Sequence, residues 1–263
     1  MTYGVAVLIV LGSCLATLAL SALAFRLLRV ELRRRHHEVG SALFLQLGVI
    51  YAVLLAFVFS QVLADVTAAA EAVSIECGDL HAVAMLSGTL PPEQGARLRE
   101  DIAAYLETVV KVEWPMMSEH HTASPDAVEK FRVMLATVSG IDAMRPQDAV
   151  LRDHMLTLLA DAHARREMRV FQAGEGVPAV TWWLLIAFGV VLTLFVAMSG
   201  TAYLPTHLLF GVTFSCSISL ILVAIGLLDY PFSGSRPLDV GDFTETLAKV
   251  REIGSSTFGQ VAR

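Results

Sequence analysis

Three long stretches without a charged side chain dominate this sequence. No Asp, Glu, Lys or Arg occurs in residues 1–25, 39–64 or 176–228. A helix needs roughly 20 apolar residues to cross ~30 Å of hydrocarbon. The first two stretches each fit one crossing, and the third is long enough for two, with Gly200 and Pro205 as helix breakers in its middle. The sequence therefore predicts four transmembrane helices, over residues 4–25, 41–63, 179–198 and 206–228.

The residues outside these stretches predict helices and no strands. Apolar residues recur at helical spacing between Glu93 and Val112, in a helix that we expect Pro115 to end. The same spacing recurs after Pro125 and after Pro146, where each proline suits the first turn of a helix. We therefore expect an all-α membrane protein whose extramembrane helical bundle is inserted between the second and third transmembrane helices. The expected parts are helices one and two with an arginine-rich loop (1–63, loop 26–40), an acidic helical domain (64–178), helices three and four (179–228) and a polar tail (229–263).

The distribution of arginine predicts the orientation in the membrane. Arg26 and Arg29 follow the first apolar run instead of preceding it, so we interpret that run as a membrane helix and not a cleaved signal peptide. The loop 26–40 holds five arginines against two glutamates, and short loops rich in Lys and Arg remain cytoplasmic. The N-terminus, the acidic domain and the C-terminus are then expected outside, on the periplasmic side of a bacterial inner membrane.

Several classes of protein find no support in the sequence. Glycine-rich phosphate loops and nucleophile elbows are absent, and no pair of acids is singled out as catalytic, so an enzyme is not predicted. The three cysteines lie in separate segments without motif spacing, which argues against a disulfide framework or a zinc site. We predict no metal, no cofactor and no nucleic-acid partner.

Arginines continue an apolar helical stripe in the acidic domain. The stripe of Met155, Leu158 and Ala162 runs at helical spacing into three arginines before the third membrane helix. Arginines on a core-facing line need carboxylate partners, because an unpaired buried charge is very costly. The alternative is that the bundle opens there and the arginines are solvated or touch lipid headgroups. The predicted ion-pair network comprises Arg165, Arg166 and Arg169 with Glu71 and Glu113, and with Glu76 as a further candidate.

The second membrane helix has two distinct faces. Small residues recur every fourth position at Gly48, Ala52, Ala56 and Ser60, and such stripes let helices approach closely in lipid. The other face carries glutamines at both ends, which should face protein or water and not lipid. In a symmetric oligomer these glutamines would flank an apolar collar; alternatively, they bond across helices as packing contacts. The predicted pore-lining residues are Gln46, Ile50, Val53, Phe57 and Gln61.

The chain resembles the bacterial bestrophin-like membrane proteins over nearly its whole length. The matching pieces are the arginine loop ending at residues 36–40, the run 48–58, Glu71-Ala72, Glu113-Trp114-Pro115, Arg165-Arg166 with Arg169, and residues 229–234. The resemblance implies a likeness to bestrophins, which are pentameric ion channels whose pores are lined by the second helix. It also implies a cytosolic helical region, whereas the charge distribution places that region outside.

We therefore hypothesise a homo-oligomeric ion channel that passes inorganic ions, its pore lined by the second helix. The acidic domain would draw cations towards the mouth, whereas the resemblance suggests anions; the sequence leaves the ion type open, and we favour cations. The alternative is a membrane-anchored sensor or scaffold whose helical domain binds a ligand or partner.

Overall fold

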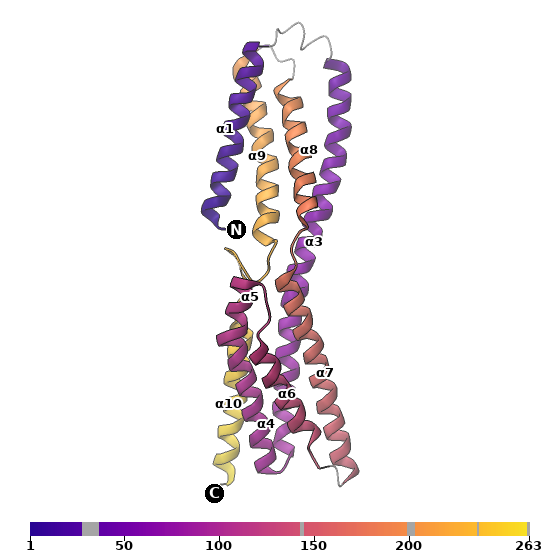
Figure 1. Ribbon diagram of the computed structural model, residues 1–263, viewed down its shortest axis with the longest axis vertical. Helices are drawn as coiled ribbons and strands as arrows, with labels where there is room; N and C mark the ends of the chain where they lie inside the picture. The colour runs from indigo at the N-terminus through magenta and orange to yellow at the C-terminus, as the bar shows by residue number, and fades with distance from the viewer. Residues whose placement is uncertain (28–36, 143–144, 199–202, 236, 262–263) are drawn as a thin grey trace. The chain divides into compact units, whose positions relative to one another are not determined.

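The computed structural model describes residues 1–27, 37–142, 145–198, 203–235 and 237–261, without the side chains of 37–39 and 255–261. Every regular element in this part of the chain is helical (Figure 1). The elements are α1 (Tyr3–Leu27), α3 (His37–Leu86), the 3-10 turn η1 (Ser87–Thr89), α4 (Pro92–Thr108), the π-helical turn η2 (Val109–Glu113), α5 (Trp114–His120), α6 (Pro125–Ser139), α7 (Pro146–Gly174), α8 (Ala179–Ala197), α9 (Leu204–Leu228) and α10 (Gly241–Val261).

The chain forms two compact units. The membrane unit comprises residues 1–64, 176–229 and 234–236, and the bundle unit comprises residues 65–175, 230–233 and 237–263. The 50-residue helix α3 contributes its first part to the membrane unit and the remainder to the bundle unit.

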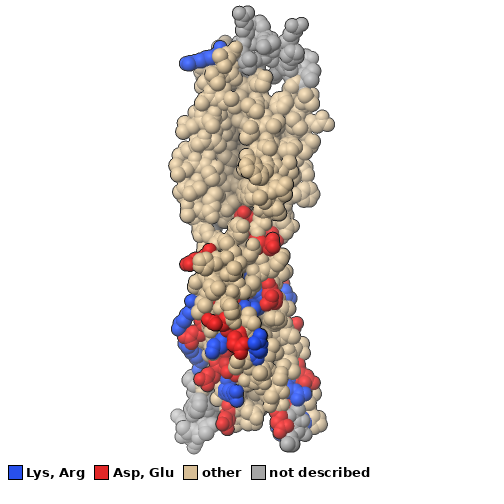
Figure 2. Space-filling view, in the orientation of Figure 1, with Lys and Arg blue, Asp and Glu red and all other residues tan. Residues whose placement is uncertain are grey.

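The membrane unit contains the four predicted transmembrane helices. The helices α1, α3, α8 and α9 are each long and apolar enough to cross a bilayer, which confirms the predicted fold class. The face of this unit that is visible in Figure 2 is almost wholly uncharged. Its largest apolar cluster joins α3 to α8 and α9 through six buried side chains: Tyr51, Leu55, Val62, Leu185, Leu192 and Ile225.

The bundle unit has a core of its own, formed by the second part of α3 together with α4 to α7 and α10. Acidic and basic side chains mark its surface in Figure 2. The side chains of Leu80, Leu98, Ile102, Met134 and Leu159 are fully buried in this core. Each of these helices is therefore stabilised by burial of one apolar face and not by propensity alone.

The C-terminal segment differs from the expected polar tail. Residues 241–261 form α10, which packs beside α4, and Phe243 and Val250 are buried in the bundle core. Phe243, Leu247 and Val250 recur at helical spacing, and this short apolar stripe is sufficient to dock the helix.

The helix that we expected to end at Pro115 continues through this residue. Residues 92–120 are helical throughout, and the turn η2 carries the chain from α4 into α5. The N–H of Trp114 donates to the carbonyl of Val109, five residues back. Pro115 lacks an N–H and its ring crowds the preceding turn, so the hydrogen-bond ladder changes its register here instead of stopping.

Candidate functional site

The membrane part of α3 presents three faces. One face packs against the rest of the membrane unit through Tyr51, Leu55 and Val62, with Tyr51 stacked on Phe188 at 6.1 Å between ring centroids. The remaining two faces, which carry the small residues and the predicted pore residues, are turned away from these contacts. Large apolar residues, and not the small ones, therefore pack α3 within its own chain.

The predicted pore residues lie together on one exposed face. Ile50, Val53 and Phe57 are 51%, 50% and 71% exposed, and Gln46 and Gln61 are also exposed. Two polar side chains and an apolar collar thus share a surface that the single chain leaves uncovered.

The small-residue face is also uncovered. Ala52, Ala56 and Ser60 are exposed, and a Cβ added to Gly48 would meet nothing within 4 Å. The structure therefore does not use this stripe for packing within the chain. Any close helix contact that these residues make must involve another molecule.

A second constellation, the charged cluster, lies in the bundle core. It consists of Glu76 on α3, Glu113 at the end of η2, and Arg166 and Arg169 on α7. The relative exposure of all four is 1% or less. Both carboxylates and both guanidinium groups are thus removed from water. Loss of one partner of such a buried pair costs about 3–5 kcal/mol, because the other charge is left unpaired away from solvent.

The charged cluster is held by charge-assisted hydrogen bonds. Arg169 donates from Nε to Glu76 Oε2 at 2.8 Å and from Nη2 to Glu76 Oε1 at 3.1 Å, a two-point contact. The same Nη2 donates to Glu113 Oε1 at 2.9 Å, and Arg166 donates to Glu113 Oε2 at 2.5 Å. Arg169 thereby joins the two carboxylates, and the charges balance.

Neighbouring groups complete this network. Tyr105 donates its hydroxyl to Glu76 at 2.5 Å, and the backbone N–H of Ser124 donates to Glu113 at 3.1 Å. Burial raises the pKa of Tyr105 well above its ordinary value, which keeps the hydroxyl protonated as a donor. Burial also disfavours the charged form of Arg169, but its interactions with Glu76, Tyr105 and Glu113 together outweigh burial, so the pKa of Arg169 is raised.

Aromatic rings cover Arg169 on its remaining side. Its guanidinium carbon lies 5.0 Å from the centroid of Phe243 and 6.0 Å from that of Trp114. Both distances are within the range of cation–π attraction. The helix α10 therefore contributes directly to the surroundings of the charged cluster.

The charged cluster differs in two members from the predicted network. Glu113, Arg166 and Arg169 come together, but Glu76 takes the place expected for Glu71, which is exposed on the other side of α3. Arg165 is half-buried and lies outside the cluster. Five residues on a helix amount to about 1.4 turns, so Glu71 and Glu76 cannot face the same partner.

The small stripe on α9 packs within the chain. Gly211, Ser215 and Ser219 are buried, and a Cβ on Gly211 would lie 3.1 Å from Ser21 Oγ and 3.3 Å from Thr17 Cγ2 of α1. Absence of a side chain at Gly211 therefore allows α1 and α9 to approach closely.

Four membrane-spanning helices joined to a helical bundle with a buried charged cluster define a class of all-α, multi-pass membrane protein. The Bestrophin-like domain family matches residues 11–238, and the chain belongs to this family. Comparison with curated proteins gives no match.

Solved structures of bestrophin homologues share this fold. Two single-substitution variants of a bacterial bestrophin homologue from Klebsiella pneumoniae are 11% and 12% identical to this chain, with a TM-score of 0.72 for each. In both comparisons the match covers 93% of this chain and 98% of the other. A structure described as a membrane protein has a TM-score of 0.74 at 11% identity, with the same coverage.

Proposed function

We propose that the chain forms a homo-oligomeric ion channel whose pore is lined by the exposed face of α3 that carries Gln46, Ile50, Val53, Phe57 and Gln61. The observation that carries this proposal is the exposure of Gln46 on a membrane-spanning helix. A polar side chain in hydrocarbon lacks hydrogen-bond partners, so this face requires water or another subunit. Bestrophins are pentameric channels, and membership of the family supports the same type of assembly.

The composition of the exposed face supports a gated pore. Ile50, Val53 and Phe57 would form an apolar constriction between two rings of glutamine. Narrow apolar constrictions close to ions by losing water. The small face of Gly48, Ala52, Ala56 and Ser60 would then pack against the neighbouring subunit, where it permits close approach.

Shortening the collar is expected to increase ion leak. Phe57→Ala in purified protein in liposomes should raise flux about tenfold, equivalent to a barrier lower by ~1.4 kcal/mol, because the constriction becomes wider and easier to wet. Ile50→Ala should act in the same direction. Phe210→Ala is the matched control, since Phe210 is 56% exposed on α9 and outside the collar.

Flux equal to that of empty vesicles in several salts would exclude the channel. The chain would then act as a sensor or scaffold through its bundle unit.

A KCl gradient across the same vesicles identifies the ion, and we expect a reversal potential towards that of K⁺. Residues 65–175 carry 18 acidic and 10 basic side chains, an excess that attracts cations. A reversal potential towards that of Cl⁻ would instead show that the channel selects anions, as the resemblance to bestrophins suggests.

We further propose that the bundle unit lies outside the cytoplasm, as the arginine-rich loop 26–40 indicates. Ser139 is exposed at the end of α6 and offers a reporter position. In a variant lacking the native cysteines, Ser139→Cys should react with a membrane-impermeant maleimide on spheroplasts without lysis. If Ser139→Cys reacts only after lysis, the bundle unit lies in the cytosol, as in bestrophins.

A further inference from the structure

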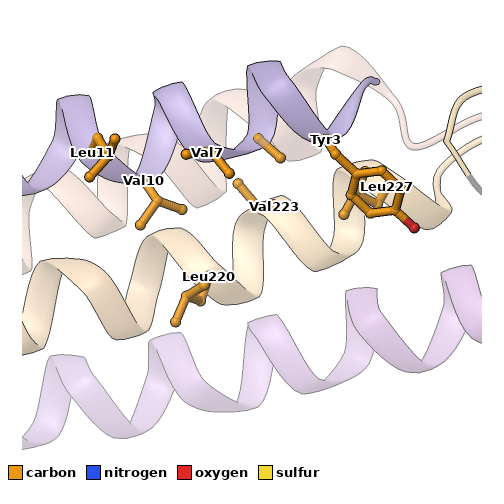
Figure 3. A pocket seen from close by; sticks show the side chains of 8 residues that line it. Tyr3, Val7, Val10, Leu11, Leu220, Val223 and Leu227 are labelled. Atoms are coloured by element: carbon orange, nitrogen blue, oxygen red, sulfur yellow. The ribbon is translucent and has the colours of Figure 1, made fainter.

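The helices α1 and α9 run side by side in opposite directions, and their contact changes in character along its length. At one end Gly211 approaches Thr17 and Ser21 closely. At the other end larger side chains leave an apolar groove of about 290 Å³ between the helices. Figure 3 shows the side chains that line this groove: Tyr3, Val7, Val10 and Leu11 of α1 and Leu220, Val223 and Leu227 of α9. Ala6 of α1 completes the lining.

Cys14 and Cys216 lie between these two zones. Cys14 is one helical turn from Val10 and one from Thr17, whereas Cys216 is about one turn from Leu220 and just over one from Gly211. The two cysteines lie at the same level of this antiparallel helix pair, close enough for their side chains to interact, and both are half-buried and free. Each residue is near the middle of its membrane-spanning helix.

We propose that Cys14 and Cys216 form a reversible disulfide that joins α1 to α9 within the membrane. A disulfide requires Cα atoms about 4.4–6.8 Å apart, a separation that two helices reach where small residues bring them together. The facing positions of the two cysteines, on helices that pack closely at Gly211 and share the groove, are compatible with this separation.

The apolar surroundings of the two cysteines favour a lipid-soluble oxidant over a water-soluble one. Both S–H bonds break and one S–S bond forms, and the two protons and two electrons pass to a lipid-soluble oxidant of the quinone class, which becomes a quinol. Exchange with a water-soluble disulfide requires a thiolate, and hydrocarbon strongly disfavours that charge. The apolar groove leads from the outside of the helix pair to within one turn of both cysteines.

Thiol counting on the full-length protein tests this proposal. A Cys77→Ser variant in liposomes retains the two membrane cysteines and is oxidised in air with copper(II) phenanthroline, a lipid-permeable catalyst. After denaturation, a polymer-linked maleimide should add two tags to the reduced protein and none to the oxidised protein. Dithiothreitol should restore both tags, and the oxidised chain should migrate as a monomer on a non-reducing gel.

A displaced cysteine provides the matched control. Ala16 is exposed on α1 two residues from Cys14, on a different side of the helix. The variant that combines Cys77→Ser, Cys14→Ala and Ala16→Cys should keep both tags under the same oxidation. Equal loss of tags in both variants, or disulfide-linked dimers in place of the monomer, would overturn the proposal. Closure by oxidised glutathione as fast as by a ring-substituted quinone would overturn the assignment of the oxidant.

Discussion

Arg169→Met should destabilise the bundle unit by about 3–5 kcal/mol, because it leaves the buried carboxylate of Glu76 without its cationic partner, with the Tyr105 hydroxyl still bonded to one oxygen, and removes one partner of Glu113. Domains are typically stable by ~5–15 kcal/mol, so this one change removes a large part of the total. The methionine retains most of the side-chain volume, which separates the loss of charge from the loss of packing. The midpoint of thermal unfolding in detergent, followed by circular dichroism, measures the effect.

Arg132→Met is the control for this substitution. Arg132 pairs with Glu129 on the surface of α6, with its side chain 71% exposed. Exposed ion pairs contribute at most about 1 kcal/mol, so the unfolding midpoint of the control should be close to that of the unmodified protein. An equally small effect of Arg169→Met would show that water reaches the charged cluster and that the cluster does not stabilise the bundle.

Gly95→Ala should also destabilise the bundle unit, by about 1–3 kcal/mol, although alanine is the better helix former. A Cβ at position 95 would lie 2.4 Å from the backbone oxygen of Ser87, and a backbone atom cannot move aside as a flexible side chain can. The turn η1 would have to shift, and with it Arg99, which donates to the hydroxyl of Ser87 at 2.9 Å. Chemical unfolding by urea, compared with the unmodified protein, gives the difference in free energy.

Gly78→Ala is the corresponding control. Gly78 lies within α3, where an added Cβ meets nothing within 4 Å. This substitution should leave stability unchanged or increase it by about 0.5–1 kcal/mol through helix propensity. If both alanine variants gain stability, the close approach of η1 to α4 is not a constraint on folding.

The sequence was sufficient to predict the membrane helices and most of the bundle. Charged side chains are so unfavourable in hydrocarbon that long uncharged runs locate the transmembrane helices without knowledge of tertiary contacts. Prolines at 125 and 146 likewise marked the starts of α6 and α7, because their fixed φ suits the first turn of a helix. Each of these signals is local in the sequence.

The partners within the charged cluster depend on tertiary contacts and could not be resolved in the same way. Glu71 and Glu76 both lie on α3, and the rotation of α3 against α7 determines which of them meets Arg169. Cys14 and Cys216 are separated by most of the chain, so their spacing carried no signal of their contact. The predicted helix end at Pro115 was wrong because the π-helical turn that accommodates this proline has no simple sequence pattern.

The charged cluster contains two carboxylates and two guanidinium groups, so its net charge is zero. The stability of the bundle unit and its electrostatic attraction for ions therefore depend on different residues. A neutral quartet has a weak electrostatic field at a distance, so the cation attraction that we propose for the bundle would come from its solvent-facing acids. Surface carboxylates could therefore be exchanged for amides to tune ion capture at little expense to folding. Alterations inside the quartet would instead affect folding first.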